Sequence, residues 1–109
     1  MENFFKYVNP AQEDKDWGLF LNCAGRLEIK PGAIYPPDAH PSGYFFSYKL
    51  GRILNEYQIN YITGGEGIYE NQSGMYKVKS GSLLLTRPDQ WHRYQPLKNT
   101  GWIENYVGF

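Results

Sequence analysis

Residues 54–70 read LNEYQINYITGGEGIYE and contain the longest alternating run of the chain. Alternate side chains of a β-strand point to opposite faces. The run therefore predicts a strand over residues 54–63, with Tyr57, Ile59 and Tyr61 on one face and Glu56, Gln58, Asn60 and Ile62 on the other. Three glycines within residues 64–67 then predict a tight turn or a bulge where the sheet curves. No helical pattern follows them, which disfavours a phosphate-binding loop.

The rest of the chain repeats this pattern of short strands and turns. Residues 83–86 are apolar on both faces, which is typical of an interior strand. Residues 35–41 hold three prolines and predict a loop. Further strands are expected at residues 17–21, 25–29, 43–50, 75–79, 91–95 and 102–109, with turns at 30–32, 71–74, 80–82 and 87–90.

These features predict an all-β fold with almost no helix, an antiparallel β-barrel or sandwich. A chain of 109 residues supports one domain. We expect residues 17–109 to form this barrel. Residues 1–16 lack periodicity, so they are expected to form an arm with little regular structure. The last strand stops in mid-pattern at Phe109, which predicts a longer parent protein.

The composition of the chain disfavours several classes of function. The 11 basic and 11 acidic residues give zero formal charge and form no Lys/Arg cluster, so direct binding to nucleic acid is disfavoured. A single cysteine and the lack of a leader pattern favour the cytoplasm. No apolar run approaches the roughly 18 residues that span a bilayer, so no membrane partner is expected. Ten tyrosines predict a wet cavity, because each buried hydroxyl needs a hydrogen-bond partner.

Strand parity selects candidate residues for that cavity. Trp102, Glu104 and Tyr106 share one face of the last strand, and His92 and Tyr94 share one face of the strand before it. Aromatic rings pack on the C–H faces of a sugar, while carboxylate and guanidinium groups bind its hydroxyls. Arg52 is the expected cation, because lysine lacks a planar fork. The group predicts a polyol site, although each of these side chains also fits a packed core.

The chain has few residues of the kinds that form metal centres or catalytic nucleophiles. The chain has two histidines, His40 and His92, whereas a mononuclear metal site usually needs three or four ligands. Cys23 has no histidine near it in sequence, and no Gly-x-Ser-x-Gly elbow or acid–base pair is present. We therefore predict no metal, no cofactor and no enzymatic activity. A site built from His40, His92 and a glutamate stays open as an alternative.

Several segments taken together resemble the N-terminal effector-binding domain of AraC-type transcriptional regulators. They are residues 52–61, 65–67, 81–85, 88–94 and 101–109, with a looser likeness at His40-Pro41 and Tyr44. The resemblance implies a cupin-like β-barrel, also called a double-stranded β-helix or jelly roll, which binds a small molecule and often a sugar. It further implies a homodimeric protein that continues into dimerising helices and two helix-turn-helix units, through which alone it contacts DNA.

The resemblance also implies site residues. In the arabinose-responsive member, the sugar is held at positions that correspond to Arg52, Tyr94, Glu104 and Tyr106 here. Glu104 replaces a histidine of that member, and Tyr106 replaces a tryptophan. The predicted ligand-binding set is Arg52, His92, Tyr94, Trp102, Glu104 and Tyr106.

Two other functions are left open by the resemblance. One is a stand-alone cupin enzyme, such as a sugar epimerase or a metal-dependent oxygenase. Such enzymes carry a His-x-His pair where this chain has Gly-Ile-Tyr-Glu at residues 67–70. The other is a dimerisation barrel whose interior is filled with side chains.

Overall fold

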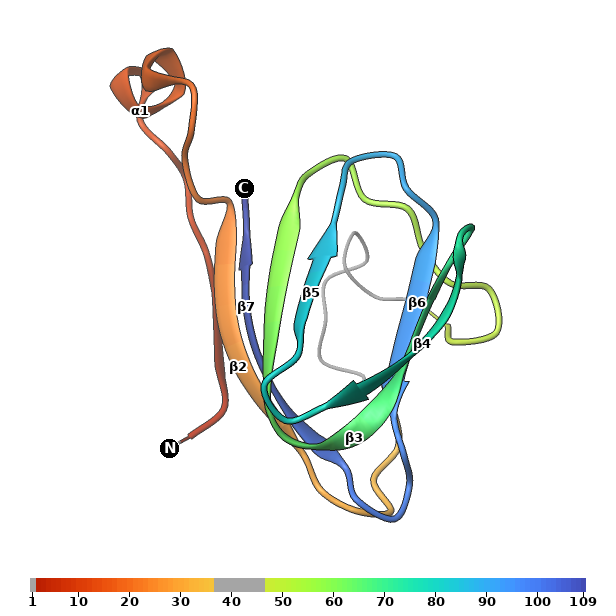
Figure 1. Cartoon of the computed structure of the whole chain (residues 1–109). Coiled ribbons are helices and arrows are strands. Elements are labelled where there is room, and N and C mark those ends of the chain that lie inside the picture. Colours follow the sequence, from red (N-terminus) through yellow and green to blue (C-terminus); the bar gives the residue numbers. More distant parts are fainter. Residues whose placement is uncertain (1, 37–46) are drawn as a thin grey trace.

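The computed structural model describes residues 2–36 and 47–109, which form an antiparallel β-barrel with one short helix (Figure 1). The strand order is β1-β2-β7-β3-β4, and β5 and β6 also pair with β3. The predicted all-β fold is confirmed. The elements are β1 (Phe4–Tyr7), α1 (Gln12–Trp17), β2 (Cys23–Ile29), β3 (Gln58–Asn71), β4 (Gly74–Lys79), β5 (Leu83–Thr86), β6 (His92–Pro96) and β7 (Trp102–Gly108).

Strand β3 belongs to both walls of the barrel. Its first half pairs with β5 and β7, and its second half pairs with β4 and β6. The register with β7 shifts between Ile62 and Gly64, so the expected bulge is confirmed. Gly65 has a φ of +76°, and a Cβ there would lie 1.9 Å from the carbonyl oxygen of Gly101. Only glycine fits this position, and the glycines bend one continuous strand instead of ending it.

The N-terminal segment differs from the expectation of little regular structure. Residues 4–7 form β1, which pairs with β2. Residues 12–17 form α1, where the Asp14 carboxylate accepts a hydrogen bond of 3.0 Å from the Ala11 N–H and Gly18 ends the helix with a φ of +95°. The strand expected at residues 17–21 is therefore wrong: Trp17 is the last residue of α1, and residues 18–21 form no strand. None of the residues of α1 is buried, and Figure 1 shows it projecting beyond the barrel.

Other strand boundaries also differ. The strand expected at residues 43–50 lies partly outside the described residues, and residues 47–50 form a turn in which the Gly51 N–H donates to the Ser47 carbonyl oxygen (2.8 Å). Strand β3 begins at Gln58, four residues after the expected start. Strand β5 is not interior: Leu83 and Leu85 are 61% and 54% exposed, because one of its faces points to solvent. The strands expected at 25–29, 75–79, 91–95 and 102–109 are confirmed to within two residues at each end.

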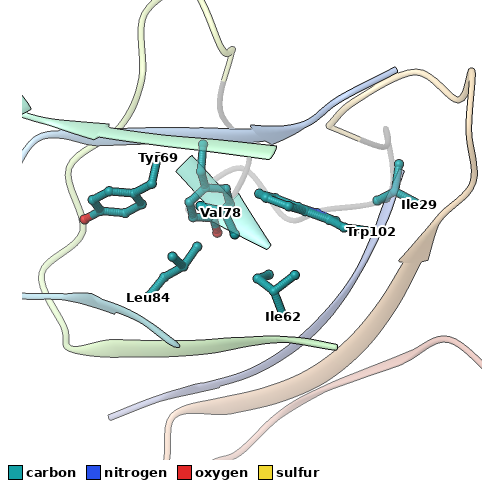
Figure 2. Close-up of a cluster of buried hydrophobic side chains, with 7 residues drawn as sticks. Ile29, Ile62, Tyr69, Val78, Leu84 and Trp102 are labelled. Atoms are coloured by element: carbon teal, nitrogen blue, oxygen red, sulfur yellow. The ribbon is translucent and has the colours of Figure 1, made fainter. Parts of the chain in front are cut away.

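An apolar cluster fills part of the barrel interior (Figure 2). Ile62 and Trp102 are almost completely buried at its centre, and β4 and β5 each contribute one buried side chain. At about 25 cal/mol per Å² of apolar surface removed from water, this cluster stabilises the barrel. Its members are Ile29, Ile62, Tyr69, Val78, Leu84, Tyr94 and Trp102. Within the described part of the chain, no helix is long and apolar enough to cross a membrane.

Candidate functional site

Polar side chains from four strands are buried in the barrel. Lone buried polar groups are costly, so such residues need partners or a function. The inward face of the first half of β3 is polar, while Tyr61 on its outward face and Tyr57 just before the strand are 45% and 42% exposed. The predicted division of this run into two faces is confirmed, with the polar set inside. The buried polar residues on strands are Gln58 and Asn60 on β3, Thr86 on β5, His92 on β6 and Glu104 on β7.

Arg52 ties the segment before β3 to β6. Its backbone exchanges two hydrogen bonds with His92, of 2.9 and 3.1 Å. Its guanidinium Nε donates to His92 Nε2 (3.0 Å), and Nη2 donates to Tyr94 Oη (2.7 Å) and to Gln58 Oε1 (2.8 Å). The guanidinium carbon lies 5.5 Å from the centre of the Tyr94 ring. One planar cation therefore orients three buried side chains.

His92 is held as a neutral ring. Since Nε2 accepts from Arg52, the ring proton belongs on Nδ1, which donates to the Gln90 carbonyl oxygen at 3.0 Å. Burial lowers the pKa of His92 to about 4; the Arg52 charge lowers this pKa further, while the bond to Gln90 opposes the change. His92 is thus an uncharged acceptor for Arg52 at neutral pH.

Glu104 is the second charged group of the interior. Its Oε2 accepts hydrogen bonds from Tyr35 Oη (2.6 Å) and Trp102 Nε1 (2.9 Å), and its Oε1 has a long contact of 3.4 Å with Asn60 Nδ2. Burial raises the pKa of Glu104 above its ordinary value, while the hydrogen bonds from Tyr35 and Trp102 and the charge of Arg52 oppose that rise. The donors fix the carboxylate and leave Oε1 the less occupied oxygen.

Arg52 and Glu104 face the same interior, Arg52 from the segment before β3 and Glu104 from β7. Among the described residues the ion pair that forms is Arg93 with Glu70, outside this cluster. Arg52 and Glu104 influence each other without such a contact. Tyr94 lies between them: burial raises the pKa of its phenol to about 12, and the Arg52 charge opposes this rise. The interior therefore brings a guanidinium, a carboxyl group and a phenol together.

Asn60 holds an unsatisfied acceptor within this buried cluster. It is 1% exposed, and its Oδ1 has no hydrogen-bond partner in the described structure. Turning the amide over would place this oxygen against the Glu104 carboxylate, so the orientation with Nδ2 toward Glu104 is preferred. A buried acceptor without a donor costs about 1–3 kcal/mol. A hydrogen bond donated to Asn60 Oδ1 by water or by a ligand would remove this cost.

Five of the six predicted site residues form one connected cluster. Hydrogen bonds join Arg52 to His92 and Tyr94, the Tyr94 and Trp102 ring centres are 6.0 Å apart, and Trp102 bonds to Glu104.

Tyr106 lies at the edge of this cluster. It is half-buried on the same face of β7 as Glu104, but its ring lies over Gly25 of β2, where a Cβ would come within 2.4 Å of it. Burial, followed by the nearby Tyr7 and Cys23, raises the pKa of Tyr106.

Three residues of the cluster were not among the predicted ligands. The inward parity of Gln58 and Asn60 was visible in the sequence, but not which face of β3 is the inner one. Tyr35 lies in the segment after β2, where no pattern predicts its contact with Glu104, 69 residues away. Tyr35 also lines a hollow of about 240 Å³ at one end of the barrel, together with Lys30, Gln95 and Leu97. Its ring therefore lies between this hollow and the buried carboxylate.

Metal-ligand groups are not assembled in the described part of the chain. No group of three His, Cys, Asp or Glu side chains is close enough there to hold an ion. Of the alternative site, His92 is bonded to Arg52, and His40 lies outside the described residues. His40-Pro41 and Tyr44, which carry the looser part of the resemblance, also lie outside them.

The fold and this buried polar cluster define a barrel of the cupin class built around a polar interior. The chain belongs to the family of the AraC-like ligand binding domain, which matches residues 31–109. No curated protein sequence matches it. The predicted family and the cupin-like fold are confirmed.

Two solved structures share the fold. YhaK from Escherichia coli superposes with a TM-score of 0.64 at 19% identity, covering 98% of this chain and 44% of that chain. A predicted oxalate decarboxylase from Thermotoga maritima superposes with a TM-score of 0.61 at 18% identity, covering 96% of this chain and 77% of that chain. At this identity the likeness shows the fold and nothing of the chemistry.

Proposed function

We propose that this chain is the effector-sensing domain of a homodimeric transcriptional regulator in the cytoplasm, and that it binds a small neutral carbohydrate. In this proposal residues 17–109 supply the ligand-binding barrel, and residues 1–16, which include β1 and most of α1, act as an arm beside it. Binding controls DNA recognition by helix-turn-helix units outside this chain. Membership of the AraC-like ligand binding family supports the sensing role. The proposal assigns no reaction to the barrel.

The observation that carries the proposal is the buried polar lining. Asn60 Oδ1 accepts no hydrogen bond, and Glu104 Oε1 has only a long contact of 3.4 Å. The barrel interior therefore contains two acceptor oxygens whose hydrogen-bonding capacity is not used. A sugar hydroxyl donates one hydrogen bond, so it matches either of these two acceptors. A singly charged ligand suits this interior less well, because Arg52 and Glu104 present opposite charges to it.

Each site residue has a distinct role in the proposal. Glu104 and Arg52 bind ligand hydroxyls by charge-assisted hydrogen bonds. Trp102 and Tyr94 provide apolar ring faces for the C–H side of the sugar. His92 positions Arg52 by accepting from Nε. Tyr106 closes the edge toward β2 and stacks on the ligand, while Tyr35 orients Glu104 and separates it from the hollow at the barrel end.

Titration calorimetry against a panel of pentoses and hexoses tests the proposal. We expect at least one sugar of the panel to bind the 109-residue chain, and Glu104→Gln to weaken that binding by at least about tenfold, since a charge-assisted hydrogen bond is lost. Glu66→Gln is the matched control, because Glu66 is exposed on the same sheet; its affinity should equal that of the wild type. Tyr106→Ala should also weaken binding.

Two results would contradict the proposal. One is the absence of heat from every sugar of the panel at concentrations of about 10 mM, which would exclude even millimolar affinity. The other is a sugar that binds wild type and Glu104→Gln equally well, which would place it elsewhere on the molecule.

A further inference from the structure

The turn at residues 47–51 lies directly before Arg52, which organises the polar cluster. Its one aliphatic side chain, Leu50, is 73% exposed, so the burial of that side chain does not anchor the turn. The residue that follows the turn forms an isolated antiparallel bridge with His92 of β6, and Figure 1 shows this segment beside β6. Polar contacts with residues 91–94 therefore decide where the turn lies.

Three successive carbonyl oxygens of the turn accept hydrogen bonds from Arg93 of β6 and from Trp91 just before this strand. Arg93 Nη1 donates to the carbonyl oxygen of Tyr48 (3.2 Å) and makes a longer contact of 3.4 Å with that of Lys49. Trp91 Nε1 donates to the carbonyl oxygen of Leu50 (2.9 Å). Backbone carbonyls need such partners, and here two side chains supply them from one direction. The turn is thereby fastened to β6.

The Arg93 guanidinium is itself fixed by several contacts. Its Nε donates to the carboxylate of Glu70, the cross-strand partner of Arg93 on β3. Its central carbon lies 4.6 Å from the centre of the Tyr48 ring and 5.6 Å from that of the Trp91 ring. A planar guanidinium donates hydrogen bonds from its edge while its faces contact rings, whereas an ammonium group has no such plane. This arrangement therefore requires arginine at position 93.

Residues 91–94 contact the turn with one face and the polar cluster with the other. Alternate side chains of an extended chain point to opposite faces. Trp91 and Arg93 hold the turn, whereas His92 and Tyr94 accept hydrogen bonds from the Arg52 guanidinium in the interior. The same short stretch therefore contacts both the side chain of Arg52 and the turn that precedes it.

The joint between the turn and Arg52 is closely packed. Gly51 has a φ of +70°, and a Cβ there would lie 2.6 Å from the indole nitrogen of Trp91 and 2.8 Å from the carbonyl oxygen of His92. Glycine is required by this backbone conformation and by this close approach. The next residue, Arg52, then exchanges its two backbone hydrogen bonds with His92. A displacement of the turn is thus transmitted to Arg52.

We propose that Arg93 is a positioning residue of the polar cluster: by holding the 47–51 turn against β6, it fixes the place of the Arg52 guanidinium. Binding sites need such support, because a functional side chain must be held within about 0.5 Å of its productive place. Arg93 is outside the predicted ligand-binding set and acts through Arg52. Its effect on ligand affinity rests on the proposed function, whereas its effect on the place of Arg52 does not.

Solvent exchange of the Arg52 Nε–H proton, followed by NMR on the 109-residue chain, tests the inference. This proton is bonded to His92 Nε2, so we expect it to exchange at least about tenfold more slowly than the Nε–H of Arg87, which is exposed in the turn after β5. Equally fast exchange of the two protons in the wild type would overturn the inference, because Arg52 would then not be held.

Two variants loosen the turn to different degrees. Arg93→Lys keeps the positive charge but loses the planar fork, so the exchange of the Arg52 proton should accelerate by at least about tenfold. Trp91→Phe keeps a ring and removes the donor to the Leu50 carbonyl oxygen, so it should accelerate the exchange less. Arg87→Lys is the matched control, because it makes the same replacement at an exposed position and should leave the exchange unchanged.

The indole N–H of Trp102, which is buried and bonded to Glu104, separates positioning from a general loss of stability. In Arg93→Lys we expect the Trp102 proton to keep its exchange rate while the Arg52 proton exchanges faster. Equal acceleration of both protons would make Arg93 a merely structural residue and overturn the inference. An Arg52 proton that keeps its wild-type rate in Arg93→Lys overturns it as well.

Calorimetry supplies a second readout with a sugar that binds the wild type. Arg93→Lys should weaken this binding by at least about threefold, and Arg87→Lys should not change it. Equal affinities of the wild type and Arg93→Lys overturn the inference, since the site would then not need this support. If no sugar binds, the proposed function fails, while the exchange of the Arg52 proton still decides the role of Arg93.

Discussion

The barrel interior has two parts of opposite chemistry. One is the apolar cluster around Ile62, Val78 and Leu84, which is packed as an ordinary core. The other is the polar cluster around Arg52 and Glu104, which holds a buried acceptor without a donor. The first part lowers the free energy of the folded state, whereas the second contains groups that are costly to bury. Residues that do not stabilise the fold are typical of functional sites.

The largest expected effect comes from damage to the apolar part. Ile62→Ala should lower the free energy of unfolding by about 2–5 kcal/mol, because Ile62 has no exposed surface and its truncation leaves a cavity. Urea denaturation measures this. Ile53 is 60% exposed, so Ile53→Ala should cost less than about 0.5 kcal/mol. Equal losses in the two variants would contradict the placement of Ile62 in a tightly packed core.

Lowering the pH should reduce the stability of the folded chain, because His92 is buried there as a neutral ring. Its pKa is lowered to about 4 in the folded chain from an ordinary 6.5, so between these pH values the unfolded chain binds a proton that the folded chain does not. Stability from this group is complete above pH 6.5 and falls as pH drops toward 4, by about 3 kcal/mol at 1.36 kcal/mol per pKa unit. Urea denaturation of the wild type and of His92→Gln across this range isolates the contribution. Parallel pH profiles would show that His92 does not titrate in this way.

A smaller effect is expected from Tyr35. Tyr35→Phe removes one hydrogen bond to Glu104 and should cost about 0.5–1.5 kcal/mol. It should also shift the fluorescence of Trp102, whose indole shares Glu104 Oε2 and whose ring centre lies 6.2 Å from that of Tyr35. Tyr76→Phe is the control, because Tyr76 is 49% exposed on β4. Unchanged stability and emission in Tyr35→Phe would remove Tyr35 from the cluster.

The smallest change in stability is expected for Glu104→Gln. Burial raises the pKa of Glu104, so the folded chain binds this proton more readily than the unfolded chain. The contribution of Glu104 to stability therefore falls as pH rises through the raised pKa. Glutamine removes this penalty, so at pH 7 the variant should unfold within about 1 kcal/mol of the wild type or prove more stable. A loss as large as that of Ile62→Ala would make Glu104 a structural residue.

The sequence predicted the parts of the molecule that depend on strand periodicity. Alternation located β3 and β7 and put Trp102, Glu104, His92 and Tyr94 on inward faces. It could do so because successive side chains of a pleated strand point to opposite faces of the sheet. It did not identify the inner face of β3, where the polar set is the buried one.

Contacts between distant loops carry no such signal. The bond from Tyr35 to Glu104 joins a connecting segment to β7, and α1 forms through local capping by Asp14 without an amphipathic pattern. The ligand chemistry also depends on such contacts, because they decide which oxygen of Glu104 remains available. Pattern reading therefore found most of the cluster and missed the residues that orient it.

The most direct test of the polar part as a ligand site is NMR of the tryptophan indole N–H groups during a sugar titration. The chain has three tryptophans: Trp102 is 1% exposed and bonded to Glu104, while Trp17 on α1 is 83% exposed. With a sugar that binds in calorimetry, we predict a saturable shift of the Trp102 indole signal and an unmoved Trp17 signal. A Trp102 signal that stays in place while the sugar binds would contradict the account.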